Sequence, residues 1–390
     1  MLWSFVWIAL LWIALGAIVG VTGMVRNSPV QHWTALHMLL LGGVSQLVLG
    51  ASQFFAGAFL ATGPPRRTLI RAQIITWNTG TVFVVIGVPH GLRPAAIAGA
   101  SCIVLALALF ARGLYGLRRR SLQRVPWAVR WYLASAACLV IGVLVGAMMT
   151  WPTPWQWGNL LGAHLALNLG GWLGTAIIGT QHTFFPSLTR TRLRWRRLQL
   201  PTFVTWMLGI AALAAGEAFT LQPVVLLGWV LLTTANVLLG CNLAASWRTG
   251  SPPRSLPARL LASAHCLGLA GLLLGTVHAA TSPAATSPVS AVVVLLLVGW
   301  IGLTVAGALM HLLAVVARIR GFATQLPQGL PIRDRALTLA ATTAIIAWAT
   351  GCEISVTRLA SVGEMMSATI AILLAMILAS RAARAAGIGA

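Results

Sequence analysis

The sequence predicts an all-α polytopic membrane protein, on the grounds of its composition and of the length of its apolar stretches. Of its 390 residues, 58% are hydrophobic and only 8% are charged, whereas soluble domains carry about 25% charged residues. The apolar residues gather into stretches long enough to cross a bilayer as a helix, which takes about 20 residues. Backbone polar groups in lipid have to be hydrogen-bonded within the chain, so these stretches are expected to be helices.

Clusters of Arg, Pro, Gly and Ser separate the apolar stretches and delimit twelve predicted spans within a single integral membrane domain, 1–390. The first span has no basic region before it and no clear cleavage site, so we expect it to be retained and not removed as a signal peptide. In chain order the spans are 2–24, 34–61, 70–90, 94–115, 131–150, 158–185, 201–221, 223–246, 258–280, 289–317, 336–356 and 361–380.

Arginine supplies all the basic charge, since the chain has 26 basic residues, none of them lysine, against 4 acidic ones. With the spans above, 23 of the arginines fall on one side of the membrane, and only Arg26, Arg93 and Arg358 fall on the other. Cytoplasmic loops retain positive charge, which predicts a multi-pass protein of the cell membrane with both termini cytoplasmic. Because the arginines lie between spans and not on a soluble surface, we expect the lipid bilayer, and no nucleic acid, as a partner.

An internal repeat of 128 residues is predicted by sliding the sixth span onto the tenth. A second shift by the same length reaches the second span, where Gly43 falls under Gly171. We therefore expect three pseudo-repeated four-helix units, about 1–128, 129–256 and 257–390, although chance likeness between glycine-rich helices is the alternative. The pairs matched by the first shift are Gly171 with Gly299, Trp172 with Trp300, Gly174 with Gly302, Gly179 with Gly307, Arg190 with Arg318 and Arg192 with Arg320.

Several titratable residues are predicted to lie near the outer side of the membrane. His37 opens the second span and His164 the sixth, at nearly the same place in the repeat, while His278 closes the ninth span and Glu217 lies near the end of the seventh. Imidazole is a common ligand of iron, copper and zinc. We therefore predict that the three histidines bind a haem or a metal, with Glu217 as a further metal ligand. Residence in the lipid headgroup zone is the alternative, and we prefer it for His32 and His90.

A second set of histidines is predicted near the cytoplasmic side. His182 and His311 close the sixth and tenth spans one residue apart in the repeat register, and His265 begins the ninth span on the same side. These three are predicted as inner haem or metal ligands, with helix-end histidines that reach the interface as the alternative. In a continuous α-helix His182 would share a face with His164 at a distance of about 27 Å along the axis.

Five cysteines occur singly, without the paired spacing of a zinc site or a disulfide framework. We predict that they are small buried residues. They are Cys102, Cys138, Cys241, Cys266 and Cys352.

Three stretches of the chain carry a resemblance to a known family: HWTALHMLLLGGVSQLVLG, GAHLALNLGGWLGTAIIGTQHTFFPSLTRTR and VGWIGLTVAGALMHLLAVVARIR. Together with twelve spans, a threefold pattern and histidines near the outer ends of the second and sixth spans, they resemble subunit I of the haem–copper oxidases. Within that superfamily the chain looks closest to the cbb3-like and NnrS-like branches.

The resemblance implies that His37 stands where the second-span haem ligand of an oxidase would be, and His164 near the sixth-span copper ligand. The seventh span lacks the adjacent histidine pair, however, and the tenth has only His311, at its inner end. A complete oxygen-reducing centre is therefore not expected, and neither is proton pumping, since acidic residues are nearly absent from the spans. What the resemblance implies is a protein that binds haem b, copper or both.

From this resemblance, the expected role of the protein is electron transfer, or the handling of nitric oxide or metal stress. It would be an oxidoreductase-like protein with a redox partner protein and a small gaseous ligand. Two alternatives stay open: a twelve-helix transporter, and an anchor subunit without cofactor for a redox partner. The 128-residue period argues against the transporter, because it divides the chain by three, whereas carriers are commonly built from two halves.

Overall fold

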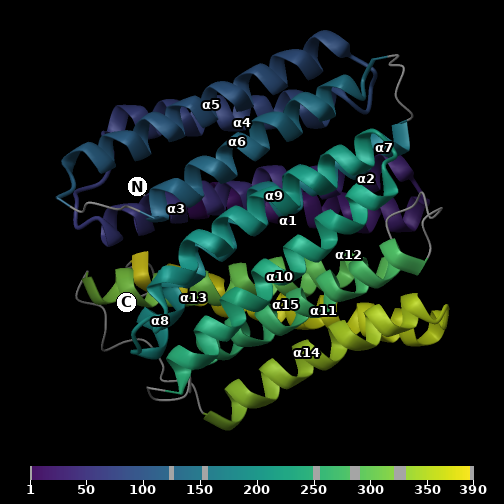
Figure 1. Ribbon diagram of the computed structural model, residues 1–390. Helices are drawn as coiled ribbons and strands as arrows, with labels where there is room; N and C mark the ends of the chain where they lie inside the picture. The colour runs from purple at the N-terminus through teal and green to yellow at the C-terminus, as the bar shows by residue number, and fades with distance from the viewer. Residues whose placement is uncertain are drawn as a thin grey trace. The chain divides into compact units, whose positions relative to one another are not determined.

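The computed structural model describes residues 2–122, 127–151, 157–248, 255–281, 290–319 and 331–386. Within these ranges every regular element is helical and there is no strand (Figure 1). The prediction of an all-α class is therefore confirmed.

The described part of the chain folds into α-helices interrupted by three π-helical segments and one short 3-10 turn. In chain order the elements are α1 (Leu2–Arg26), α2 (Pro29–His37), η1 (Met38–Val44), α3 (Ser45–Phe59), α4 (Arg67–Gly87), α5 (Arg93–Arg120), α6 (Trp127–Met148), α7 (Trp157–Leu165), η2 (Ala166–Gly174), α8 (Thr175–Thr189), η3 (Arg196–Leu198), α9 (Gln199–Ala218), α10 (Gln222–Trp247), α11 (Leu256–Thr281), α12 (Ser290–Val293), η4 (Val294–Gly302), α13 (Leu303–Ile319), α14 (Pro331–Glu353) and α15 (Thr357–Ala386).

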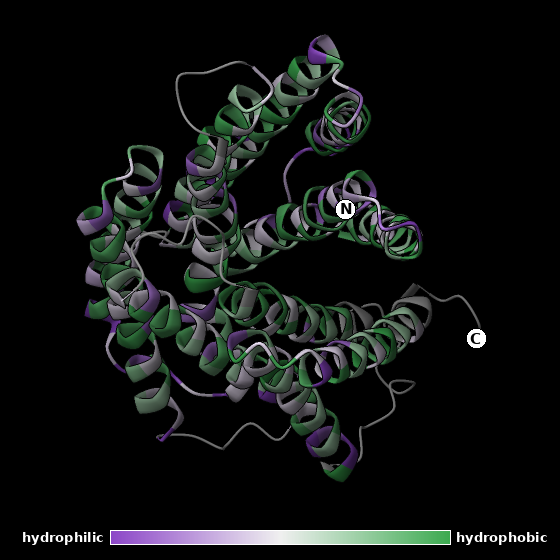
Figure 2. Cartoon of the chain, turned by 90° about the vertical axis from the view of Figure 1, so that its right-hand side faces the viewer, coloured by the Kyte–Doolittle hydropathy of each residue, from purple (hydrophilic) through white to green (hydrophobic). Residues whose placement is uncertain are grey.

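Twelve of the described helical stretches are long and apolar enough to cross a membrane. They correspond one to one with the predicted spans, and their limits differ by a few residues: the fifth, expected over 131–150, runs over Trp127–Met148. Hydrophobic residues cover most of the length of these helices (Figure 2). The chain is therefore a multi-pass membrane protein.

The three π-helical segments lie in the second, sixth and tenth spans. They begin at Met38, Ala166 and Val294, so successive segments start 128 residues apart, and each contains glycine. Because π-helical turns are rare, their recurrence at this spacing supports the predicted threefold repeat, whose unit limits stay a prediction.

The π-helical segment of the sixth span changes one expectation about the histidines. The prediction that His164 and His182 share a helix face assumed an unbroken α-helix, and that assumption is wrong because η2 lies between the two residues. Hydrogen bonds from residue i to i+5 turn the chain by a smaller angle per residue than α-helical bonds do. The spacing of these two histidines therefore does not place them on one face.

The chain divides into two compact units, which we describe separately. Unit 1 comprises Met1–Thr180 and Ala214–Leu221, and unit 2 comprises Gln181–Leu213 and Gln222–Ala390. Unit 1 thus contains the first five spans, most of the sixth and the last turn of α9.

Glycines set the close helix packing of unit 1. A Cβ atom at Gly42 would lie 2.6 Å from the indole of Trp12, so α1 packs directly on η1. The second and sixth spans are joined by a buried hydrogen bond in which Trp172 Nε1 donates to Ser45 Oγ over 2.9 Å. An indole N–H has to find an acceptor in an apolar interior, so this bond satisfies a donor that would otherwise oppose folding.

Unit 2 is packed around α11, which contacts α10, η4 and α13. A Cβ at Gly268 would lie 2.7 Å from the Trp300 indole, and the Trp300 ring meets the edge of Trp206 at a centroid distance of 5.8 Å. Helices α14 and α15 approach each other most closely at Gly351 and Gly363. Small residues at these positions let the backbones of neighbouring membrane helices come into contact.

Candidate functional site

His37 is the last residue of α2 and directly precedes the π-helical segment η1. Its helix is started by Ser28, whose hydroxyl accepts a hydrogen bond from the backbone N–H of Gln31. The imidazole stacks on Trp33 with ring centroids 3.8 Å apart, and Nδ1 lies 2.9 Å from the Trp33 carbonyl oxygen. A carbonyl only accepts, so Nδ1 is the protonated nitrogen.

His164 lies in α7, two residues before the π-helical segment η2. Its Nδ1 lies 2.9 Å from the carbonyl oxygen of Gly142 in α6. A Cβ atom at Gly146, one turn further along α6, would lie 2.8 Å from the imidazole Cε1. Asn168 donates over 2.6 Å to the His164 carbonyl, and its amide lies against Gly142. Two glycines on one face of α6 therefore make the space in which this ring and amide lie.

The two histidines share one arrangement. In each ring Nδ1–H donates to a backbone carbonyl, which leaves the lone pair on Nε2, and among the described residues nothing hydrogen-bonds to either Nε2. Both residues belong to unit 1. A backbone carbonyl on the second ring nitrogen is the usual support of a histidine that binds a metal. His37 and His164 thus share the same local support, and their joint binding of a cofactor stays a prediction.

Glu217 also lies in unit 1, near the end of α9, but it faces another side of α7. A Cβ atom at Gly162 would lie 2.5 Å from Glu217 Oε2. Positions two residues apart on an α-helix point about 200° away from each other. The carboxylate of Glu217, which lies against Gly162, therefore faces away from the His164 side of α7. The geometry therefore does not favour Glu217 as a third ligand, and its role stays a prediction.

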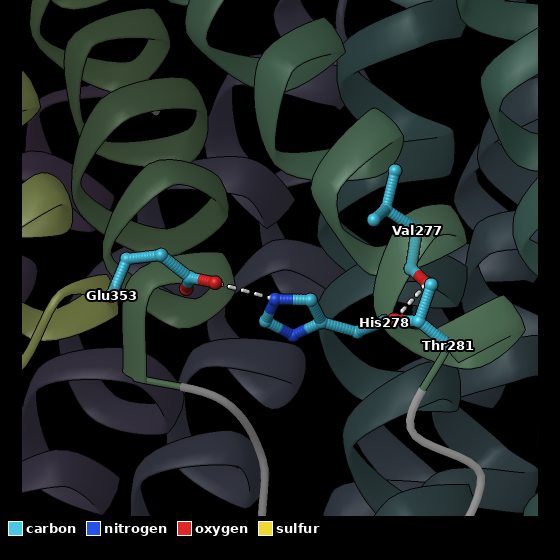
Figure 3. A network of polar contacts seen from close by, with 4 residues as sticks. All are labelled: Val277, His278, Thr281 and Glu353. Carbon is cyan, nitrogen blue, oxygen red and sulfur yellow. Dashed lines mark hydrogen bonds and ion pairs between the residues drawn. The ribbon is translucent and has the colours of Figure 1, made fainter.

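His278 lies in unit 2, in the last turn of α11. Its Nε2 lies 2.7 Å from Oε1 of Glu353, the last residue of α14 (Figure 3). The histidine side chain is 21% exposed and the glutamate side chain 35%. One of the two ring nitrogens that could bind a metal is thus used in a contact between two helix ends.

Loss of this contact is expected to change stability little. Exposed ion pairs contribute about 0–1 kcal/mol, so Glu353→Gln should leave the apparent thermal midpoint of the purified protein nearly unchanged, as should the control His90→Gln in the exposed turn after α4. A fall of the midpoint by many degrees in Glu353→Gln alone would contradict this view of the pair.

The three inner histidines all belong to unit 2 and stand in different surroundings. His182 is buried at 2% exposure. His311 meets the edge of the Phe184 ring at a centroid distance of 5.3 Å. His265 lies against Gly240 of α10, where a Cβ atom would come within 2.7 Å of Nε2. Haem ligation by any of them stays a prediction.

No group of three or more His, Cys, Asp or Glu side chains that could hold a metal ion occurs in the part of the chain that the structure describes. The cysteines do not change this result, since all five are free. The prediction that they are buried is right for Cys138 and wrong for Cys241 and Cys266, which are exposed.

Sequence reasoning missed the residues that hold the two outer rings in place: Trp33, Gly142, Gly146 and Asn168. The signal for them was the pair of glycines four residues apart in the fifth span, which places both on one helix face.

In comparisons with known proteins, no protein-family model and no curated protein matches this chain.

Proposed function

We propose that the chain is an integral membrane redox protein that binds haem b through Nε2 of His37 and Nε2 of His164. The observation that carries the proposal is the shared arrangement of the two rings. In each ring Nδ1–H donates to a backbone carbonyl, so the lone pair of Nε2 is available to bind iron. The resemblance to haem–copper oxidase subunit I supports His37 as a haem ligand, whereas it places His164 near a copper ligand, so the pairing of the two residues on one haem rests on their shared arrangement.

The donor set suits haem better than copper. Two imidazoles would suffice to hold a haem iron. A protein copper site commonly adds a third ligand, and Glu217, the nearest candidate, is directed to another side of α7. Copper held by the two histidines alone is the second choice. Bound haem would supply a one-electron couple and a site for a small gaseous ligand.

The chain's own residues hold the rings ready for this role. The carbonyls of Trp33 and Gly142 select the tautomer and make Nε2 more basic. The Trp33 ring and the Gly146 surface restrict rotation of the two imidazoles. A ligand that is already oriented loses less conformational entropy on binding.

The role that we propose is electron transfer, or the handling of nitric oxide or metal stress. The same proposal includes oxidoreductase activity and a redox partner protein. A complete oxygen reductase is not proposed. The excess of arginine on one side supports insertion in the cell membrane with both termini cytoplasmic.

The test is a reduced-minus-oxidised optical spectrum of the detergent-purified protein, with metal analysis of the same sample. We expect haem b bands in the wild type, and their loss in His37→Ala and in His164→Ala. The matched control is His90→Ala, because His90 also bonds a carbonyl through Nδ1, at 2.8 Å from Ile86 O, but lies in the exposed turn after α4.

Three results would overturn the proposal or part of it. Copper without haem would replace the cofactor while keeping the site. Equal haem content in all three variants would show that haem binds elsewhere. A wild type with neither haem nor copper would favour the transporter or the cofactor-free anchor subunit.

A further inference from the structure

Unit 2 contains a set of buried polar atoms that no described residue satisfies. They belong to Asn236 in α10, His265 in α11, Trp300 in η4 and Thr304 in α13, which we call the polar cluster. Asn236 is 0% exposed, Trp300 2% and Thr304 7%. Both amide atoms of Asn236, both ring nitrogens of His265, the indole nitrogen and the threonine hydroxyl are without a hydrogen-bond partner among the described residues.

Helix α11 brings the first two members of the cluster together. His265 faces α10 at Gly240, where a Cβ atom would lie 2.7 Å from Nε2. Asn236 precedes Gly240 by four residues, so it lies one turn away on the same face of α10. The amide and the imidazole therefore lie in one interface, about one helical turn apart.

The other two members lie on the neighbouring side of α11. A Cβ at Gly268, one turn beyond His265, would lie 2.7 Å from Trp300. A Cβ at Gly307 would contact Leu261. From Trp300 to Gly307 the residue numbers rise along η4 and α13, whereas from Gly268 to Leu261 they fall along α11, so η4 and α13 run antiparallel to α11.

This antiparallel register sets the depth of Thr304. Within α13, Thr304 precedes Gly307 by three residues, about one turn, and Gly307 packs against Leu261, so Thr304 lies level with His265. The cluster thus has two layers one turn apart: Asn236 with Trp300, and His265 with Thr304.

Leaving this set unpaired would be costly. A buried donor or acceptor without a partner costs about 1–3 kcal/mol, and few such groups occur in native proteins. The cluster contains fixed donors, in the indole N–H and the amide NH₂, and fixed acceptors, in the amide oxygen and one imidazole nitrogen. It contains no carboxylate and no guanidinium. The chemistry that fits is a small neutral molecule that both donates and accepts hydrogen bonds.

The repeat-equivalent tryptophan of unit 1 provides the contrast. Trp172 precedes Trp300 by 128 residues and is also 2% exposed, but its indole donates to Ser45. The unpaired indole of Trp300 is therefore not a general property of this position in the repeat.

We propose that the polar cluster of unit 2 is a binding site for a small neutral hydroxyl-type molecule, with water as its simplest occupant. The site does not depend on the two outer histidines, so it stands or falls separately from haem binding.

The first test is X-ray hydroxyl-radical footprinting of the detergent-purified full-length protein in H₂¹⁸O, read by mass spectrometry. Radiolysis of a bound water oxidises the side chains beside it even where bulk solvent is excluded. We expect Trp300 to be modified several-fold faster than Trp172, which is equally buried. Native mass spectrometry of the same sample detects an organic occupant as a neutral added mass.

Variants connect the signal to the cluster. Asn236→Leu keeps the side-chain size and removes the amide, and it should bring Trp300 modification down to the level of Trp172, or remove the added mass. Thr304→Val provides the same test where Asn236→Leu does not fold. The control Thr233→Val removes a hydroxyl already paired with Thr276 over 3.1 Å and should change neither readout.

The outcomes separate the two sources of ligand. Modification of Trp300 that depends on Asn236 identifies water, and an added mass that depends on Asn236 identifies an organic molecule. Equal protection of Trp300 and Trp172 without an added mass would overturn the proposal, and so would modification that persists unchanged in Asn236→Leu and Thr304→Val.

Discussion

Gly146→Val is expected to abolish haem binding while leaving both proposed ligands in the chain. A Cβ atom at this position would already lie 2.8 Å from Cε1 and 3.1 Å from Nδ1 of His164. The added methyl groups would displace the ring from the Gly142 carbonyl that orients it. Disturbing such a support costs about 10- to 100-fold in metal affinity, so haem content per protein, measured by the pyridine haemochrome spectrum, should fall accordingly.

Gly116→Ala is the matched control for this variant. Gly116 lies in α5 of the same unit, and a Cβ there would meet no atom within 4 Å. The control should retain full haem content and gain slightly in stability, because alanine favours helix by about 1 kcal/mol over glycine. Full haem content in Gly146→Val as well would mean that the orientation of His164 does not matter for binding.

The double variant Gly351→Ala/Gly363→Ala is expected to destabilise unit 2 strongly. Ideal Cβ atoms at these positions would overlap the backbone nitrogens of Ala360 and Trp348. Backbone atoms cannot move aside as flexible side chains do, so α14 and α15 would have to separate. Overpacking costs about 1–3 kcal/mol for each site.

The measurement is the yield of monodisperse protein in size-exclusion chromatography and its apparent thermal midpoint, again with Gly116→Ala for comparison. Each single variant should lower the midpoint, and the double variant should lower it further. Unchanged midpoints would contradict the close approach of these two helices. Haem content is not part of this test, so it is independent of the proposed function.

The class of the protein and the course of its chain through the membrane were predictable from the sequence. Hydrophobicity summed over about 20 residues is a local property, so the twelve spans follow from composition alone. The 128-residue period likewise pointed to His37 and His164 as equivalent positions near the start of two spans.

The partners of individual side chains were not predictable in this way. Hydropathy places a residue at a depth but does not set the rotation of its helix, because lipid-facing and buried surfaces of a membrane helix are both apolar. Glu217 was expected beside the outer histidines at the right depth, yet it faces Gly162; His278 was expected with them as well, and it contacts Glu353.

Rotation of the helices is decided by glycine contacts and π-helical turns, which appear only once the helices are packed. Three π-helical segments alter the helical phase of the second, sixth and tenth spans, so counting residues at 100° each fails across them. The carbonyl of Gly142 and the polar cluster around His265 likewise depend on which helix lies alongside. Sequence thus determined what enters the membrane and at which depth, and the tertiary structure determined which side chains meet there.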